Sequence, residues 1–322
     1  MMTMSQHFLL SAAAKTLKLK DIYVAGEEKA YETFRAIRWP ETAGAAVCPA
    51  CGCIDAYEIK SRRKFECRAC RKQFSVTSGT IFASRKLSFM DLLGAICILA
   101  NAAKGLSSLQ LSRDLGVQYK TAFVLAHKIR EAIAGETRAA KVDGVASIDG
   151  CYVGGHIRPA NLKENRIDRR LSRFQTGKRR VVIALRDHDG RTLTHVSKSE
   201  ADGVEFAFAR AAADTVIHAD EANHWDALAD RLPVKRINHS EAYSLDGIHT
   251  NFVESYFARL RRMVAGQHHH VSPQYLHAYA SHAAWLEDHR RESNGALAGR
   301  IVRNAMTSPV SRLWKGYWQR RA

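Results

Sequence analysis

Three acidic residues in the C-terminal two-thirds of the chain have the residue type and the placement to share a metal site. Asp149 lies inside a short apolar run, Asp220 ends a strand-like run, and Glu254 lies near the start of a predicted helix. Magnesium prefers a few carboxylates together with water and phosphate oxygens, and a pair of such ions stabilises both the attacking and the leaving oxygen in phosphoryl transfer. The three carboxylates therefore predict a metal-dependent nuclease or transposase that uses two magnesium ions.

Two of these acids have an alternative interpretation. Glu221 follows Asp220 directly and would be the ligand in a different strand register. Glu254 lies where a carboxylate would stabilise a helix N-terminus, and Asn251, on nearly the same helix face, is the fallback ligand. Asp149 is the firmest candidate, because an acid inside a buried strand is costly unless it is paired or bound to metal.

Five of the seven cysteines lie close together near the N-terminus. Cys48 and Cys51 form one Cys-x-x-Cys pair, and Cys67 and Cys70 form a second pair about 15 residues later. This spacing is typical of a four-cysteine zinc ribbon, in which structural zinc replaces a hydrophobic core too small to be stable alone. Cys53 is too close to Cys51 to be another ligand of the same pair, so we interpret it as free.

The remaining cysteines and a histidine run have weaker claims to chemistry. Cys97 lies in an apolar run and is predicted to be a buried small hydrophobe. Cys151 is two residues after Asp149, but hard metals reject thiolate. His268–His270 cannot all converge on one ion, and imidazole is a poor magnesium ligand, so they are interpreted as phosphate contacts or a helix cap.

The composition indicates a globular, nucleic-acid-binding protein of more than one domain. The chain has 322 residues, a formal net charge of +17 and 46% hydrophobic residues, with an isoelectric point near 9.8. A surplus of this size attracts polyanions, and a merely basic or ribosome-associated surface is the alternative. No apolar stretch reaches the roughly 18 to 20 residues of a membrane span, so we expect a cytoplasmic, nucleoid-associated protein without a membrane partner.

A helix pair and a later series of strands complete the sequence pattern. Residues 105–130 predict two helices with a turn at Gly116, which indicates a helix-turn-helix, the alternative being an ordinary helical hairpin. From about residue 145 the pattern predicts strands at 146–152, 180–185 and 193–196, a helix at 203–213, a strand ending at Asp220, a helix over 225–232 and a last strand at 234–238. With the later helix that carries Glu254, this order predicts an α/β, RNase H-like sheet with helices on it. The basic segment 158–178 is predicted to be a loop that orders on DNA.

The predicted segments define five parts of the chain. They are a helical lead (1–44), a zinc ribbon (45–80), a helix-turn-helix DNA-binding region (81–140), an RNase H-like catalytic domain (141–292) and a basic C-terminal tail (293–322).

Four motifs of the chain resemble those of the ISXO-type insertion-sequence transposases of bacteria and archaea. They are the ribbon region 48–82, Ile148–Gly155, His249–Ser255 and His269–Leu276, and the resemblance runs from about residue 45 to about 291. It implies a DDE-type transposase, which cuts DNA at the ends of its own element and joins the freed 3′ hydroxyls to target DNA. Asp149, Asp220 and Glu254 fall on the catalytic positions.

The chain departs from the family pattern at two positions. The Lys that usually follows the third acid by seven residues is Arg261 here, which keeps a cation on that helix face. Many relatives place an acid directly after the first Asp, where this chain has Gly150. The resemblance implies double-stranded DNA as partner and a homo-oligomer that pairs two element ends. The alternatives are a catalytically inactive zinc-ribbon and helix-turn-helix DNA-binding protein derived from a transposase, and a resolvase or repair nuclease.

Overall fold

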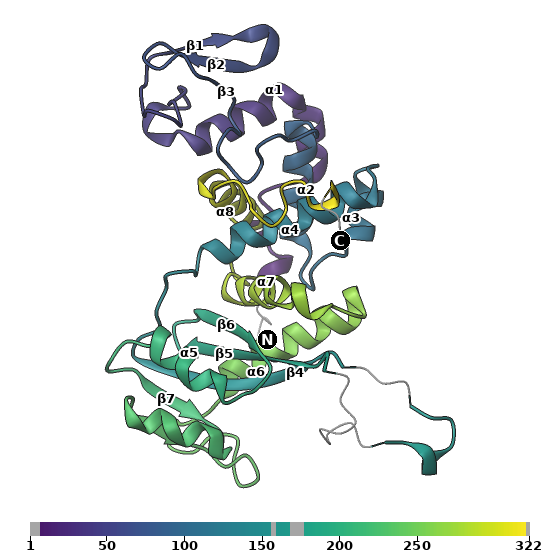
Figure 1. Cartoon of the computed structure of the whole chain (residues 1–322), viewed down its shortest axis with the longest axis vertical. Helices are drawn as coiled ribbons and strands as arrows, with labels where there is room; N and C mark the ends of the chain where they lie inside the picture. The colour runs from purple at the N-terminus through teal and green to yellow at the C-terminus, as the bar shows by residue number, and fades with distance from the viewer. Residues whose placement is uncertain (1–6, 156–158, 168–176, 320–322) are drawn as a thin grey trace, which may run out of the picture. The chain divides into compact units, whose positions relative to one another are not determined.

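The computed structural model describes residues 7–155, 159–167 and 177–319. The chain divides into two compact units (Figure 1). Unit 1 contains Met1–Glu136 and His289–Ala322, and unit 2 contains Thr137–Asp288. The predicted basic loop over 158–178 falls partly outside the described residues, at Arg158 and at residues 168–176.

The N-terminal part of unit 1 is a small antiparallel sheet beside a helix. The sheet has the strand order β1-β2-β3, and aromatic rings form its core. Trp39 packs edge-on against Phe65 and Phe74, with ring centroids 5.7 and 6.4 Å apart. Tyr31 and Phe34 of the helix are buried. The elements are α1 (Leu19–Arg38), β1 (Ala56–Ile59), β2 (Lys64–Cys67) and β3 (Gln73–Phe74).

Helices make up the rest of unit 1. Serine side chains cap three of them, because Ser88, Ser107 and Ser293 accept from the backbone N–H groups of Asp91, Gln110 and Ala296. Gly116, with φ 63°, makes the turn between α3 and α4. The buried guanidinium of Arg130 donates to the Leu106 carbonyl and joins α4 to the segment before α3. The helices are α2 (Phe89–Asn101), α3 (Ser108–Asp114), α4 (Tyr119–Gly135) and α8 (Asn294–Thr307).

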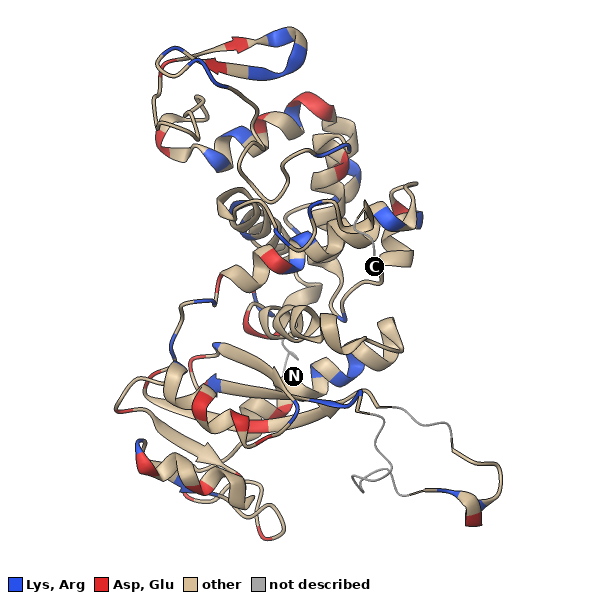
Figure 2. Cartoon of the chain, viewed as in Figure 1, with Lys and Arg blue, Asp and Glu red and all other residues tan. Residues whose placement is uncertain are grey.

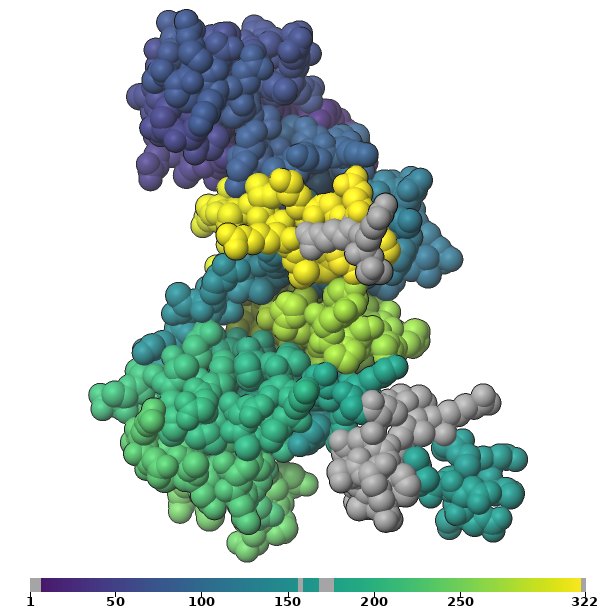
Figure 3. Space-filling model, in the orientation of Figure 1, coloured from purple at the N-terminus to yellow at the C-terminus, as the bar shows by residue number. Residues whose placement is uncertain are grey.

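The C-terminal segment 293–322, for which the sequence predicts a basic tail, is folded over most of its length. Helix α8 packs against α1, α2 and α4 of the same unit, and Figure 3 shows these C-terminal residues in yellow against the N-terminal ones. Apolar residues on one face of the helix explain the packing, since the i and i+4 positions lie side by side. The buried residues are Leu297, Ala298, Ile301, Val302, Ala305 and Met306.

Unit 2 is built on a five-stranded sheet with the strand order β6-β5-β4-β7-β8. Strands β4, β5 and β6 are antiparallel neighbours, whereas β7 is parallel to β4 and β8 is parallel to β7. The strands occur where the sequence predicts them. They are β4 (Val145–Val153), β5 (Arg180–Asp187), β6 (Thr192–Ser197), β7 (Val216–Ala219) and β8 (Val234–Arg236).

The helices of unit 2 follow the predicted order, with one difference in type. The segment predicted as a helix over 225–232 forms a 3-10 helix, in which residues three apart share a face. Trp225 and Leu228 are spaced in this way and both are fully buried. The elements are α5 (Asp202–Arg210), the 3-10 helix η7 (Asn223–Asp230), α6 (Asn251–Met263) and α7 (Leu276–Asp288).

Single turns of helix link these elements. They are η1 (Phe8–Leu10), η2 (Ala12–Ala14), η3 (Pro40–Thr42), η4 (Lys60–Arg62), η5 (Lys163–Asn165), η9 (Pro273–Tyr275), η10 (Tyr317–Gln319) and the π-helical turn η8 (Val264–His268). No helix among the described residues combines the length and the apolar character that a membrane span requires.

Alternate side chains of β4 lie on opposite faces of the sheet, in two different environments. Ile148 belongs to the main apolar core, together with Ile183, Leu185, Ile217 and Trp225. Successive strand residues point to opposite faces, so Asp149 lies on the face away from this core. On that second face Arg186 of β5 pairs with Glu287 of α7 at 3.5 Å, and both side chains are 3% exposed. This buried pair ties the sheet to the helix that covers it.

Candidate active site and zinc centre

Asp149 lies at the middle of β4, opposite Ala184 of β5. Its Oδ1 accepts a hydrogen bond of 2.6 Å from the Gly150 backbone N–H. Burial raises the pKa of Asp149 to about 7, and the negative charges of Asp220, Glu200 and Glu254 add to the increase, although the Gly150 hydrogen bond opposes it. Four carboxylates are therefore close enough to act on one another through their charges.

Asp220 follows the last residue of β7 and lies beside the strand that holds Asp149. The parallel register pairs Ser147 with His218, and Asp149 and Asp220 are each two residues further along. Side chains two residues apart in a strand share a face, so this register directs both acids to the same side. Asp220 Oδ1 accepts from the Ala222 N–H at 3.2 Å. Asp220 is half-buried and Glu221 is exposed, so the geometry favours Asp220 as the ligand.

Glu254 lies in the first turn of α6, and two side chains hold it in place. Thr250 donates its hydroxyl hydrogen to Glu254 Oε1 at 2.9 Å. His239 Nε2 lies 2.8 Å from the Thr250 hydroxyl and 3.6 Å from Glu254 Oε1. The helix N-terminus stabilises a carboxylate at this position. Glu254 can therefore cap the helix and also be available as a metal ligand. Asn251, the fallback ligand, is the exposed first residue of α6.

Arg261 lies two turns after Glu254 and faces the sheet. Burial raises the pKa of the Cys151 thiol, and the positive charge of Arg261 opposes this effect. Cys151 is two residues from Asp149 and so shares its strand face. The cation therefore lies on the side of α6 that faces the carboxylates.

Three histidines connect the N-terminus of α6 to the sheet. The rings of His188 and His249 stack at 5.1 Å, and His218 Nδ1 lies 3.3 Å from the His249 carbonyl oxygen. Ser147 of β4 donates to the same carbonyl at 3.1 Å. Burial lowers the pKa of His188 and of His218. His249 thus acts in packing, and it fixes the backbone directly before Thr250.

Glu200 is a residue of this site that the sequence analysis missed. It lies in the loop between β6 and α5, where no apolar periodicity marks a functional position. Tyr152 donates its hydroxyl hydrogen to Glu200 Oε2 at 3.4 Å, and His224 Nε2 lies 3.9 Å from the same oxygen. Burial raises the pKa of Glu200, and the charge of Asp220 adds to this effect. In the sequence, the glycine directly after Asp149 was the only sign that a carboxylate from elsewhere in the chain lies at this position.

The four ribbon cysteines form a zinc site, as their spacing predicts. Their sulfur atoms all lie within 4.8 Å of one another, and the Cys48–Cys70 and Cys51–Cys67 sulfurs are 3.6 Å apart. Tetrahedral zinc with bonds of about 2.3 Å requires sulfurs about 3.8 Å apart, so the geometry fits. The Cys70 backbone N–H lowers the pKa of Cys67 to about 6, which favours the thiolate that zinc binds.

The other two sequence predictions for cysteine agree with this arrangement. Cys53 is outside the group of four sulfurs, and its sulfur accepts from the Asp55 backbone N–H at 3.4 Å. Cys97 is fully buried in α2.

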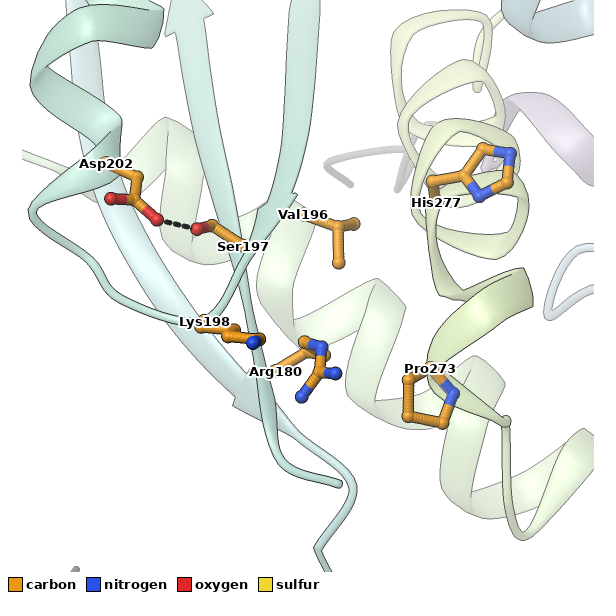
Figure 4. A pocket seen from close by; sticks show the side chains of 7 residues that line it. All are labelled: Arg180, Val196, Ser197, Lys198, Asp202, Pro273 and His277. Atoms are coloured by element: carbon orange, nitrogen blue, oxygen red, sulfur yellow. Dashed lines mark hydrogen bonds between the residues drawn. The ribbon is translucent and has the colours of Figure 1, made fainter. Parts of the chain in front are cut away.

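An open pocket of about 520 Å³ lies on unit 2 apart from the acids. Figure 4 shows Arg180 and Lys198 extending into the same space, with Pro273 opposite and a hydrogen bond between Ser197 and Asp202 beside it. Val196 and His277 complete the lining. Asp202 also lines the pocket, so the two positive groups, Arg180 and Lys198, have one carboxylate beside them.

Two family models match the chain, one in each unit. Residues 141–288 match the ISXO2-like transposase domain, and residues 25–73 match the transposase zinc-ribbon domain. The first match covers the sheet and all four acids, and the second takes in most of α1 as well as the ribbon. No curated protein and no solved structure shows significant similarity to the chain.

These domains define the chain as a DNA-transposing enzyme by class. It belongs to the ISXO-type insertion-sequence transposases, which confirms the resemblance found in its motifs.

Proposed function

We propose that the chain is an active DDE-type transposase of a prokaryotic insertion sequence. It binds the terminal inverted repeats of its element, cuts the DNA there and joins the freed 3′ hydroxyls to target DNA. The observation that supports this most strongly is the placement of Asp149 and Asp220 on the same side of neighbouring strands, with Glu254 of α6 close enough for its charge to act on Asp149. We assign this domain to the RNase H-like fold on its strand order and pairing directions.

We assign the three carboxylates to a pair of magnesium ions, which lie about 3.5–4 Å apart in sites that transfer phosphoryl groups. Among the described residues, only the cysteine group has three or more candidate ligand atoms within 4.8 Å of one another, so the carboxylates would have to close around the ions. When bound, magnesium would offset the charge that develops on the attacking and leaving oxygens.

The surrounding residues orient these ligands. Thr250 and His239 fix the Glu254 carboxylate, and the Gly150 backbone N–H fixes that of Asp149. Arg261 supplies a cation on the same face, which we assign to a phosphate of the DNA strand being cut. Arg180 and Lys198 in the open pocket would extend this contact along the DNA backbone.

Unit 1 supplies the proposed recognition of the element ends. We assign α3 and α4 to a helix-turn-helix, in which the N-terminal residues of the second helix contact base edges. Tyr119 and Lys120 begin α4 and are exposed. Figure 2 shows Lys and Arg concentrated on the β1–β2 hairpin of the ribbon, where they would contact phosphate. Pairing of two ends would require a dimer or a larger assembly, acting on the nucleoid.

Cleavage of a labelled DNA that carries the element's own ends, with magnesium present, tests this function. The wild-type chain should nick the DNA at the element end. Asp149→Ala should lower the rate by about 10²–10⁴-fold, because a metal ligand contributes several kcal/mol to the transition state. The variant should still bind the ends. Specific binding by the wild type with no cleavage in magnesium or manganese would instead indicate an inactive DNA-binding derivative.

A further inference from the structure

The space above Gly150 is filled by the carboxylate of another residue. A Cβ added at Gly150 would lie 2.2 Å from Glu200 Oε1 and 2.5 Å from Glu200 Cγ. Contacts this short do not occur between real side-chain atoms, so any larger residue at position 150 would displace Glu200. Because Gly150 has no side chain, the space above it holds the carboxylate of Glu200, which lies in a loop about fifty residues later in the chain. We call this space the seat of Glu200.

Glu200 is held in this seat from two further directions. The Tyr152 hydroxyl donates to its Oε2 at 3.4 Å, and His224 Nε2 lies 3.9 Å from that oxygen. The guanidinium of Arg179 lies 4.0 Å from the centre of the Tyr152 ring and supports the tyrosine. The Glu200 side chain is only 21% exposed. Its position is thus set by the fold, and its charge adds to those of Asp149 and Asp220.

We propose that Glu200 is an electrostatic supporting residue of the metal site: its carboxylate, seated over Gly150, increases the affinity of Asp149, Asp220 and Glu254 for divalent cations. Gly150 and Asp149 point to opposite faces of β4, so Glu200 acts through its negative charge, which attracts a cation more strongly to the nearby ligands. This inference rests on the proposed metal-dependent function, but it concerns metal binding and not cleavage itself.

Binding of Mn²⁺ alone to the zinc-loaded full-length chain tests the role of Glu200 without DNA. Electron paramagnetic resonance measures the free Mn²⁺ during a titration. Glu200→Gln should weaken binding about tenfold, which is the usual effect of losing a group that supports metal ligands. Glu205→Gln is the matched control, because it removes the same charge from an exposed position five residues away and should leave binding unchanged.

A double-mutant cycle tests the seat itself. Gly150→Ala should weaken Mn²⁺ binding in the wild type, because the new methyl group displaces Glu200. In a Glu200→Ala background the same change should have little further effect, since the space is already empty. Equal effects of Gly150→Ala in both backgrounds would contradict the proposal.

Thermal unfolding of the zinc-loaded chain without magnesium or manganese separates this electrostatic role from a purely structural one. Glu200→Gln relieves repulsion among like charges, so the metal-free variant should be at least as stable as the wild type. A variant that is less stable without metal, or that binds Mn²⁺ as tightly as the wild type, would overturn the proposal. If Glu200→Gln weakens Mn²⁺ binding but the wild type cuts no DNA, the proposed function fails and the role of Glu200 stands.

Discussion

Replacing Cys67 with serine is expected to release the zinc and unfold the ribbon. The four sulfurs fit a tetrahedral ion, and Cys67 is the thiol whose pKa is lowered to about 6. Zinc contributes about 10–16 kcal/mol to folding in small zinc-binding peptides, and the aromatic core around Trp39 is too small to compensate for such a loss. Elemental analysis should find one zinc per wild-type chain and none in Cys67→Ser.

Cys53→Ser is the matched control for this experiment, because Cys53 lies outside the group of four sulfurs. It should keep its zinc and resist proteolysis, whereas Cys67→Ser should be cut within residues 45–80. A full complement of zinc in Cys67→Ser, or its loss in Cys53→Ser, would show that the ligand assignment is wrong. Loss of the ribbon should also weaken DNA binding, and high salt should reduce that effect because it screens phosphate contacts.

Asp149→Asn is expected to stabilise the metal-free protein above about pH 7. The folded pKa of Asp149 is about 7 and its ordinary value is 3.8. The folded state therefore binds the proton more tightly than the unfolded state, so the wild type loses stability as pH rises from about 4 to about 7. The asparagine variant lacks this loss, and the gain should be of the order of a few kcal/mol at about pH 8.

Urea unfolding of unit 2, followed in a chelator at several pH values, measures this difference. The two proteins should converge below about pH 3, where Asp149 is protonated in both states of the wild type. Magnesium should stabilise the wild type by about 2.7 kcal/mol at a hundred times its dissociation constant and should have little effect on the variant. An asparagine variant that is less stable than the wild type at about pH 8 would contradict the assigned environment of Asp149.

The sequence was sufficient to predict the elements that position the carboxylates. Apolar runs bounded by turn residues located β4 and β7, and the end of the second run placed Asp220 directly after its strand. The Cys-x-x-Cys spacing predicted the zinc ligands because local geometry alone brings each pair together. Both predictions depend on short-range order, which a single sequence expresses directly.

The features that depend on tertiary contacts could not be predicted. Glu200 lies in a loop, and its approach to Gly150 is set by how the β6–α5 connection crosses the sheet. Thr250 and His239 become significant only when α6 brings them to Glu254. The segment 293–322 has a basic composition, which did not indicate that its apolar residues pack against α1, α2 and α4.

Joining of a precut DNA end to a target plasmid tests the central claim most directly, because it isolates the chemical step from recognition of the uncut end. Wild-type protein with magnesium should join the exposed 3′ hydroxyl to the plasmid. Asp149→Asn, Asp220→Asn and Glu254→Gln should each lower the joining rate by about 10²–10⁴-fold while DNA binding persists. Glu221→Gln, the neighbouring acid, should join normally. Equal joining by the wild type and the three carboxylate variants would contradict the assignment of these residues to the active site.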